Sequence, residues 1–278
     1  MRLQIHHATH YEYGQPVMHA VQALCLTPRS SAHQTVERWE VRAPGRLFES
    51  VDGFGNLTHT YTLSGRLTKG TIRAEGVVET HACPEVIDAP GLPPPQLYLR
   101  ATALAEPHRR VAEFAAPHLD DGADPARLLM LAEAVRAQVV YRPGATGVHT
   151  TALEAFDWGK GVCQDQAHVF IAACRSHGVP ARYVSGYFHA VDAPELASHA
   201  WADVCIDAAA RRWLSIDVTH ACLMDERHVR LAIGTDYAAC PPVKGIRTGG
   251  GEETMQVHID MQRLPPDFRA PVSGVHSA

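Results

Sequence analysis

A cysteine that could act as a nucleophile lies at the start of an expected helix. Cys163 opens the segment CQDQAHVFIAACRS, shortly after Gly159 and Gly161, and Gly178 with Pro180 supplies the stop. In the first turn of a helix, free backbone N–H groups and the positive end of the helix dipole stabilise a thiolate. The same N–H groups can stabilise an oxyanion, and the two glycines let the backbone approach a substrate. This arrangement favours acyl transfer through a thioester.

A thiolate nucleophile usually has a histidine partner, and His199 in SHAWADV and Asp217 in LSIDVTH are suitable partners. Both segments are strand-like, with a turn-prone DAAA between them. A hairpin of residues 199–206 and 212–218, turning near Ala208, would place His199 opposite Asp217 on one face. A carboxylate beside an imidazole fixes its tautomer and supports the imidazolium. We therefore expect Cys163 to be the nucleophile, His199 the base and Asp217 the orienting residue.

Other histidines compete with His199 for the role of base. His168 lies on the expected helix but points away from Cys163, and His177 is at its far end. His220 is nearer to the hairpin but lies beyond Asp217, and it remains an alternative base.

Neighbouring residues have simpler expected roles. Cys174 falls on the apolar stripe of the helix and is expected in the core, and Asp165 is expected to cap the helix N-terminus. A second oxyanion donor is needed beside the Cys163 N–H, and Trp158 and Tyr141 are upstream candidates.

The histidines and cysteines do not form a recognisable metal motif. Seven cysteines at irregular spacing include no C-x-x-C pair, which argues against a zinc ribbon and a disulfide framework. Among the eighteen histidines, His6, His7 and His10 lie in an alternating, strand-like stretch without a carboxylate or cysteine partner. His6 and His10 should lie on its solvent-exposed face. We expect no metal and no organic cofactor.

The sequence predicts an α+β protein with two parts. Residues 1–82 alternate polar and apolar residues between turn signals at 43–45, 52–53 and 64–65, which indicates an antiparallel β region. A proline-rich connection follows. We place the N-terminal β domain with this connection at residues 1–95, and the remainder at residues 96–278.

The second part should contain a nucleophile-bearing helix packed on an antiparallel sheet. A preceding helix is expected after Asp124-Pro125, because Asp caps a helix and Pro suits its first position. Its apolar face comprises Leu128, Leu131, Ala132, Val135 and Val139. Residues 254–261 should form a further strand, and the tail after Pro265 has no clear element.

These motifs resemble the bacterial transglutaminase-like superfamily. The resemblance rests on GVCQDQAHVFIAACRSHGVPARYVSGY, SHAWADV and IDVTH, and on the N-terminal YEYGQPV, LTPR and DGFGN. It covers most of the chain and implies a papain-like fold with Cys163, His199 and Asp217 as the triad. Two positions differ: Val218 stands where members commonly have proline, and Thr235 where they have arginine. These differences affect loop geometry and substrate preference rather than the triad.

Composition excludes several classes of partner. The 278 residues are 46% hydrophobic and 20% charged, with a formal net charge of -5 and no basic stripe, so a nucleic-acid partner is not expected. No signal peptide or long apolar run is evident, and we expect a cytoplasmic protein that does not associate with membranes. The sequence does not indicate the oligomeric state.

Two classes of function remain open, besides a metalloprotein that uses the many histidines, which would carry stoichiometric metal when purified. One is an enzyme that attacks peptide or glutaminyl carbonyls and releases the acyl group to water or to an amine. The other is a catalytically idle module that holds a peptide in the same cleft. Activated, pH-dependent alkylation of one cysteine would favour the enzyme.

Overall fold

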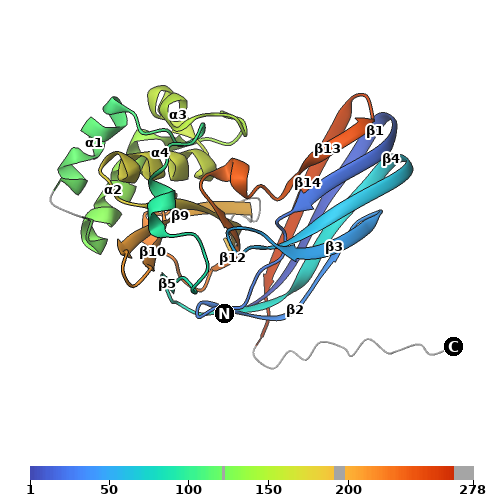
Figure 1. Cartoon of the computed structure of the whole chain (residues 1–278), viewed down its shortest axis with the longest axis horizontal. Helices are drawn as coiled ribbons and strands as arrows, with labels where there is room; N and C mark the ends of the chain where they lie inside the picture. The colour runs from blue at the N-terminus through green and yellow to red at the C-terminus, as the bar shows by residue number, and fades with distance from the viewer. Residues whose placement is uncertain (121–122, 191–197, 266–278) are drawn as a thin grey trace.

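The chain folds into an α+β structure with two separate antiparallel sheets, as the sequence predicts. A computed structural model describes residues 1–120, 123–190 and 198–265. Within these residues each sheet has six strands, and helices pack against one of the two sheets. Figure 1 shows the helices on one side of the molecule and the long strands of the other sheet on the opposite side. No helix in this described part is long and apolar enough to cross a membrane.

The N-terminal sheet is built on two long central strands. These central strands, which pair with each other, are β1 (Arg2–Leu24) and β4 (Leu57–Thr80). On one side, β4 also pairs with β2 (Gln34–Arg42) and β3 (Arg46–Val51). On the other side, β1 also pairs with β13 (Val243–Gly249) and β14 (Glu253–Arg263). Side chains alternate between the faces of β1 as expected, so His6 and His10 are exposed whereas His7 is buried.

One expected turn in this region is absent. The Ser64-Gly65 pair was expected to end a strand, but β4 continues through it. The pairing register with β1 shifts here, since Ser64 pairs with His19 and Leu67 with Val17. Gly65 has a φ of 142°, which favours glycine. The glycine therefore accommodates a bulge rather than a hairpin turn.

The chain returns to the N-terminal sheet at its end. The strand expected at residues 254–261 is present as β14, and it pairs with β1 from Leu3 to Tyr13. β13 pairs with the second half of β1. The N-terminal sheet is therefore made from both ends of the described chain. A division at residue 95 holds for the elements up to residue 242, but β13 and β14 belong to the N-terminal sheet although they follow that division in the sequence. The tail after Pro265 lies outside the described residues.

The second sheet carries the helical layer. Its strands run in the order β11 (Cys222–Leu223), β10 (Arg212–Asp217), β9 (Ser198–Asp207), β8 (Ala181–Phe188) and β12 (His228–Gly234). The proline-rich connection contributes only β5 (Glu85–Ile87), which pairs with β10, and a short 3-10 helix, η1 (Pro95–Leu99). This fits its expected extended character.

Four α-helices pack around one apolar core in this part of the described chain: α1 (Arg109–Leu119), α2 (Pro125–Gln138), α3 (Ala152–Trp158) and α4 (Cys163–Ser176). Asp124 caps α2 as expected, accepting hydrogen bonds from the N–H groups of Ala126 at 2.9 Å and Arg127 at 3.2 Å. The apolar face predicted for α2 is completely buried. Cys174 is also buried, which confirms its place in the core. The two short strands β6 (Val140–Tyr141) and β7 (Lys160–Gly161) form a parallel pair just before α4.

Side-chain amides from the N-terminal region cover an edge of the second sheet. β12 is an edge strand, so part of its backbone lacks a strand partner. Gln34 bonds the N–H and C=O of Arg230 at 2.8 and 2.9 Å, and Asn56 bonds those of Ile233 at 2.8 Å each. These contacts join the two sheets and satisfy the exposed edge.

Candidate active site

Cys163 is the first residue of α4, as the sequence predicts. The side chain of Asp165 accepts hydrogen bonds from the N–H of Val162 at 2.7 Å and the hydroxyl of Thr146 at 2.6 Å, which confirms that Asp165 caps the helix. The first N–H groups of a helix have no partner within the helix. Cys163 is partly exposed, so its sulfur and these N–H groups can meet an incoming carbonyl.

The two glycines before the nucleophile serve the local fold. Gly159 ends α3 in the left-handed conformation, at a φ of 64°. Gly161 is buried, and a Cβ there would lie 2.6 Å from the Cβ of Asp165. Neither glycine is among the described residues that line the cavity around Cys163. Both glycines are thus required for the local fold before the helix, and their expected role in approaching a substrate stays a prediction.

His199 and Asp217 are brought together by β9 and β10, but not in the expected register. The observed ladder pairs Ile216 with Ala202 and Ser215 with Asp203, so Asp217 lies level with Trp201 rather than with His199. The turn spans residues 208–211, because Asp207 pairs with Arg212, and it therefore lies later than the expected turn near Ala208. A one-residue shift between Arg212 and Trp213, where Ile206 is the extra residue of β9, then brings Asp217 level with Trp201. His199 and Asp217 still share a face, and the His199 Nε2 donates to Asp217 Oδ2 at 2.8 Å.

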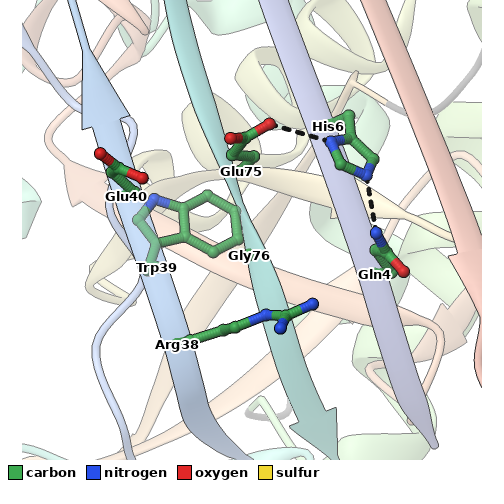
Figure 2. A pocket seen from close by; sticks show the side chains of 7 residues that line it. All are labelled: Gln4, His6, Arg38, Trp39, Glu40, Glu75 and Gly76. Atoms are coloured by element: carbon green, nitrogen blue, oxygen red, sulfur yellow. Dashed lines mark hydrogen bonds and ion pairs between the residues drawn. The ribbon is translucent and has the colours of Figure 1, made fainter. Parts of the chain in front are cut away.

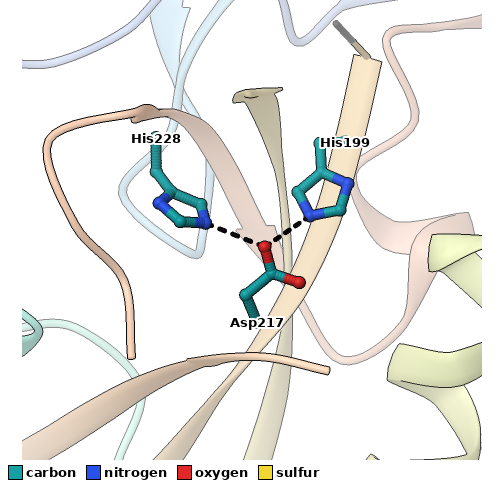
Figure 3. A group of neighbouring side chains, drawn as sticks. All are labelled: His199, Asp217 and His228. Carbon is teal, nitrogen blue, oxygen red and sulfur yellow. Dashed lines mark hydrogen bonds and ion pairs between the residues drawn. The ribbon is translucent and has the colours of Figure 1, made fainter. Parts of the chain in front are cut away.

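One oxygen of Asp217 receives three imidazole N–H groups. Besides His199, it accepts hydrogen bonds from His220 Nδ1 at 2.7 Å and His228 Nε2 at 3.0 Å. Figure 3 shows His199 and His228 approaching the carboxylate from two sides. Burial alone would raise the pKa of Asp217, but the charge of His199 and these hydrogen bonds hold it well below its usual range. The carboxylate is therefore ionised and fixed in place.

The same contacts determine the state of His199. Its Nε2 is bound to Asp217, which leaves Nδ1 as the nitrogen available to Cys163 at the same cavity. Burial alone would lower the pKa of His199, but the charge and hydrogen bond of Asp217, together with the influence of Cys163, raise it to about 10. His199 thus favours the imidazolium at neutral pH, between a carboxylate and a sulfur.

A cavity of about 230 Å³ lies over the sulfur. Cys163 and His199 both line it, together with parts of β8 and η3 (Tyr237–Ala239). The structure therefore places the candidate nucleophile and base at one enclosed surface, with Asp217 behind the histidine.

The competing histidines lie elsewhere or act on Asp217. The buried ring of His168 accepts a hydrogen bond from the N–H of Tyr237 at 3.2 Å, and His177 lies at the end of α4 near Asp120. His220 stacks on Phe188 and bonds Asp217, but it is not among the described residues that line the cavity. This arrangement favours His199 over His220 as the base.

Neither expected oxyanion donor lies at the cavity. Trp158 is 51% exposed and lines a different surface hollow with Ala145 and Lys160. Tyr141 lies in β6, and it too is not among the residues described as lining the cavity around Cys163.

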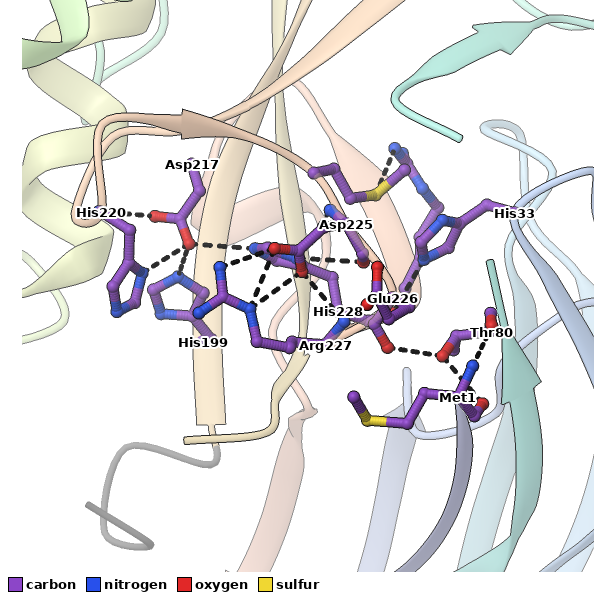
Figure 4. Close-up of polar contacts among 12 residues, drawn as sticks. Met1, His33, Thr80, His199, Asp217, His220, Asp225, Glu226, Arg227 and His228 are labelled. Carbon is purple, nitrogen blue, oxygen red and sulfur yellow. Dashed lines mark hydrogen bonds and ion pairs between the residues drawn. The ribbon is translucent and has the colours of Figure 1, made fainter. Parts of the chain in front are cut away.

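His228 is a site residue that the sequence analysis missed. Its fully buried ring bonds Asp217, and Figure 4 shows that the turn carrying it is also held from the N-terminal region. His33 Nε2 donates to the His228 carbonyl at 2.8 Å, and the Thr80 hydroxyl donates to the Glu226 carbonyl. The only signal in the sequence is a histidine at the start of a strand-like stretch, and this signal says nothing about its partner.

One group of described residues has the side chains and the spacing that could hold a metal ion. Its members are His199, Asp217 and His228, whose ligand atoms lie within 4.8 Å of one another. Each imidazole, however, donates an N–H to the carboxylate. A cation would need both nitrogens deprotonated and both hydrogen bonds broken. The contacts are fully explained by hydrogen bonding.

Comparisons with known proteins agree with this geometry. Residues 112–218, which include Cys163, His199 and Asp217, match the model of the transglutaminase-like superfamily, and residues 3–79 match that of the bacterial transglutaminase-like N-terminal region. An uncharacterized protein of Mycobacterium leprae is 31% identical over 95% of this chain and 99% of its own length. An uncharacterized protein of Mycobacterium tuberculosis is 30% identical over 94% of this chain and 92% of its own.

A solved structure shows the same fold. The crystal structure of a candidate cysteine protease from Cytophaga hutchinsonii superimposes with a TM-score of 0.76 and 20% identity, over 97% of this chain and 92% of that one. The fold, the two family matches and the full-length relatives lead to one conclusion. This chain belongs to the bacterial transglutaminase-like family.

Proposed function

We propose that this protein is a cysteine-dependent enzyme that cleaves or transfers acyl groups at the amide bonds of peptide or glutaminyl substrates, with Cys163, His199 and Asp217 as its triad. One observation carries the proposal: Cys163 begins a helix and shares a cavity with His199, whose second nitrogen is bound to a buried carboxylate. This order of groups is the one that a nucleophile, its base and an orienting residue require, and it supports the proposal.

The reaction follows from these contacts. The thiol proton passes to Nδ1 of His199, and the sulfur attacks the amide carbonyl to form a C–S bond. N–H groups at the start of α4 stabilise the oxyanion. His199 then gives its proton to the leaving nitrogen as the C–N bond breaks. Water or a second amine attacks the thioester, losing a proton to His199, and the thiol is regenerated as the acyl group leaves.

Trapping the acyl-enzyme tests this function. The protein is incubated with a peptide library, quenched in acid, digested and examined by mass spectrometry for an added acyl mass on a cysteine. We expect the added mass on Cys163 and its release by hydroxylamine, which cleaves thioesters. Adding a primary amine before the quench separates transfer from hydrolysis by its product. An acyl mass on another cysteine, or on none, would contradict the proposal.

Replacing Asp217 with asparagine should lower kcat without abolishing activity. Asparagine keeps an oxygen that can accept from His199, but it removes the charge that supports the imidazolium. Losing a general acid–base group typically lowers the rate about 10²–10⁴-fold, and we expect the loss of kcat in this variant to be smaller. The measurement is kcat on a substrate found by trapping, with a thermal melt to show that the fold persists. A loss equal to that of His199→Ala would mean that Asp217 does more than orient.

Removing divalent metal ions should leave activity unchanged. The proposed steps use only side chains and backbone N–H groups, and the imidazoles nearest to Asp217 are engaged in hydrogen bonds. The rate is measured before and after dialysis against EDTA. Loss of activity that a divalent ion restores would overturn the metal-free mechanism.

A further inference from the structure

The N-terminal sheet reaches the cavity over Cys163 through a side chain of its own, His7. This residue lies on the inward face of β1 and is 4% exposed. Its Nδ1 is hydrogen-bonded to the hydroxyl of Tyr187 at 2.8 Å, and its Nε2 to the hydroxyl of Thr9 at 3.2 Å. His7 and Cys163 line the same cavity, although His7 belongs to β1 of the N-terminal sheet and Cys163 to helix α4.

Packing around His7 fixes its position relative to the catalytic core. Leu3 and Ile5 on the same face of β1 form one apolar cluster with Tyr187, Val229 and Leu231 of the second sheet. All five side chains are buried. The wall that contains His7 is therefore part of a packed interface, and its ring cannot swing away without breaking that packing.

Apart from the pair of Cys163 and His199, the described residues give the cavity no fixed charge that could receive an ionic group. No lysine, arginine, aspartate or glutamate is among the described residues that line it. Burial lowers the pKa of His7 to about 4, so its ring is neutral at pH 7. His199 already has Asp217 as its counter-ion. A carboxylate or ammonium entering beside His7 would lose its hydration without gaining a partner, whereas the hydroxyls and the neutral ring can receive an uncharged group.

We propose that His7 makes the N-terminal sheet one wall of the acyl-binding pocket, and that this pocket selects acyl groups with an uncharged side chain. The inference rests on the proposed function, because it takes Cys163 to be the acylated residue. It assigns the N-terminal β region a direct part in choosing the substrate.

Two small alkylating agents test the charge of this wall without a known substrate. Iodoacetamide is neutral and iodoacetate is anionic, and both modify a reactive thiolate. The second-order rate constant for alkylation of Cys163 is measured with each, by mass spectrometry of the peptide that contains it. The quantity compared is the ratio of the iodoacetate rate to the iodoacetamide rate. A change in thiolate reactivity affects both rates and cancels in this ratio.

Substituting His7→Arg should raise this ratio. A guanidinium in the wall attracts the anionic reagent selectively, and at a separation of several ångströms within a protein the effect should be about tenfold or more. The matched control is His6→Arg, the same change at the neighbouring residue. His6 lies on the opposite, exposed face, where it contacts Gln4 at 2.8 Å and Glu75 at 3.1 Å (Figure 2). The control should keep the wild-type ratio.

A second variant covers the case in which arginine prevents folding. His7→Ala removes the ring and widens the pocket, so a bulky neutral reagent, N-phenyl iodoacetamide, should gain several-fold in rate relative to iodoacetamide. Thermal melts establish which variants are folded. If the folded His7 variants keep the wild-type selectivity, His7 does not form the pocket wall and the inference is wrong. If wild-type Cys163 is not alkylated faster than the other cysteines, the proposed function itself fails, and the inference fails with it.

Discussion

Replacing Cys163 with alanine should abolish turnover while leaving the fold intact. The sulfur forms the covalent bond to the acyl group, and Cys163 has the only thiol among the described residues that line the cavity. Loss of a triad nucleophile lowers kcat on the order of 10⁶-fold. The substitution removes one sulfur atom from a partly exposed position at the start of α4, so the melting temperature should change little.

A control separates this effect from the loss of any cysteine. All seven cysteines are free thiols, and Cys83 is likewise partly exposed but lies in the connection between the two parts of the chain. Cys83→Ala should keep wild-type kcat. Activity of Cys163→Ala near that of the wild type, on any substrate found by trapping, would show that Cys163 is not the nucleophile.

Replacing His199 with alanine should have the second largest effect. His199 takes the proton of the thiol and later returns one to the leaving nitrogen, so its removal deletes two proton transfers. Each is typically worth about 10²–10⁴-fold in rate. The loss should exceed that of Asp217→Asn, because the asparagine variant keeps the imidazole in place. The comparison is made at pH 7 by measuring kcat for both variants.

The pH dependence of alkylation gives an independent test of His199. Because the pKa of His199 is raised to about 10, its ring holds a proton at neutral pH, and this positive charge supports the thiolate form of Cys163. Alkylation of the wild type should therefore persist well below pH 8. Without His199 the rate should rise with pH as it does for a free thiol, with a midpoint at a pH of about 8.5.

His220 provides the decisive comparison for this profile. It contacts Asp217 but is not among the described residues that line the cavity, so His220→Ala should shift the alkylation profile less than His199→Ala. A larger shift in His220→Ala would identify His220 as the base. Uniformly slow alkylation of every cysteine in the wild type would instead favour an idle peptide-binding module.

The sequence alone determined the elements that carry the candidate site. Local signals identified the helix that begins at Cys163, its capping by Asp165 and the cap of α2 at Asp124. These features depend on a few consecutive residues, because caps and apolar periodicity act over one or two turns. Cys163, His199 and Asp217 could be recognised because each lies in a short motif that resembles the transglutaminase-like superfamily.

Only the tertiary structure decided how these elements meet. Contacts between distant residues depend on strand register and on the return of β13 and β14 to β1, and neither leaves a local signal. His228 lies beside Asp217 because β12 joins the second sheet next to β8, and His7 lies beside the cavity because β1 packs against that sheet. An extra residue in β9, Ile206, placed Asp217 level with Trp201 and so on the same face as His199. The sequence thus determined which side chains could do the chemistry, whereas long-range packing decided which of them share a site.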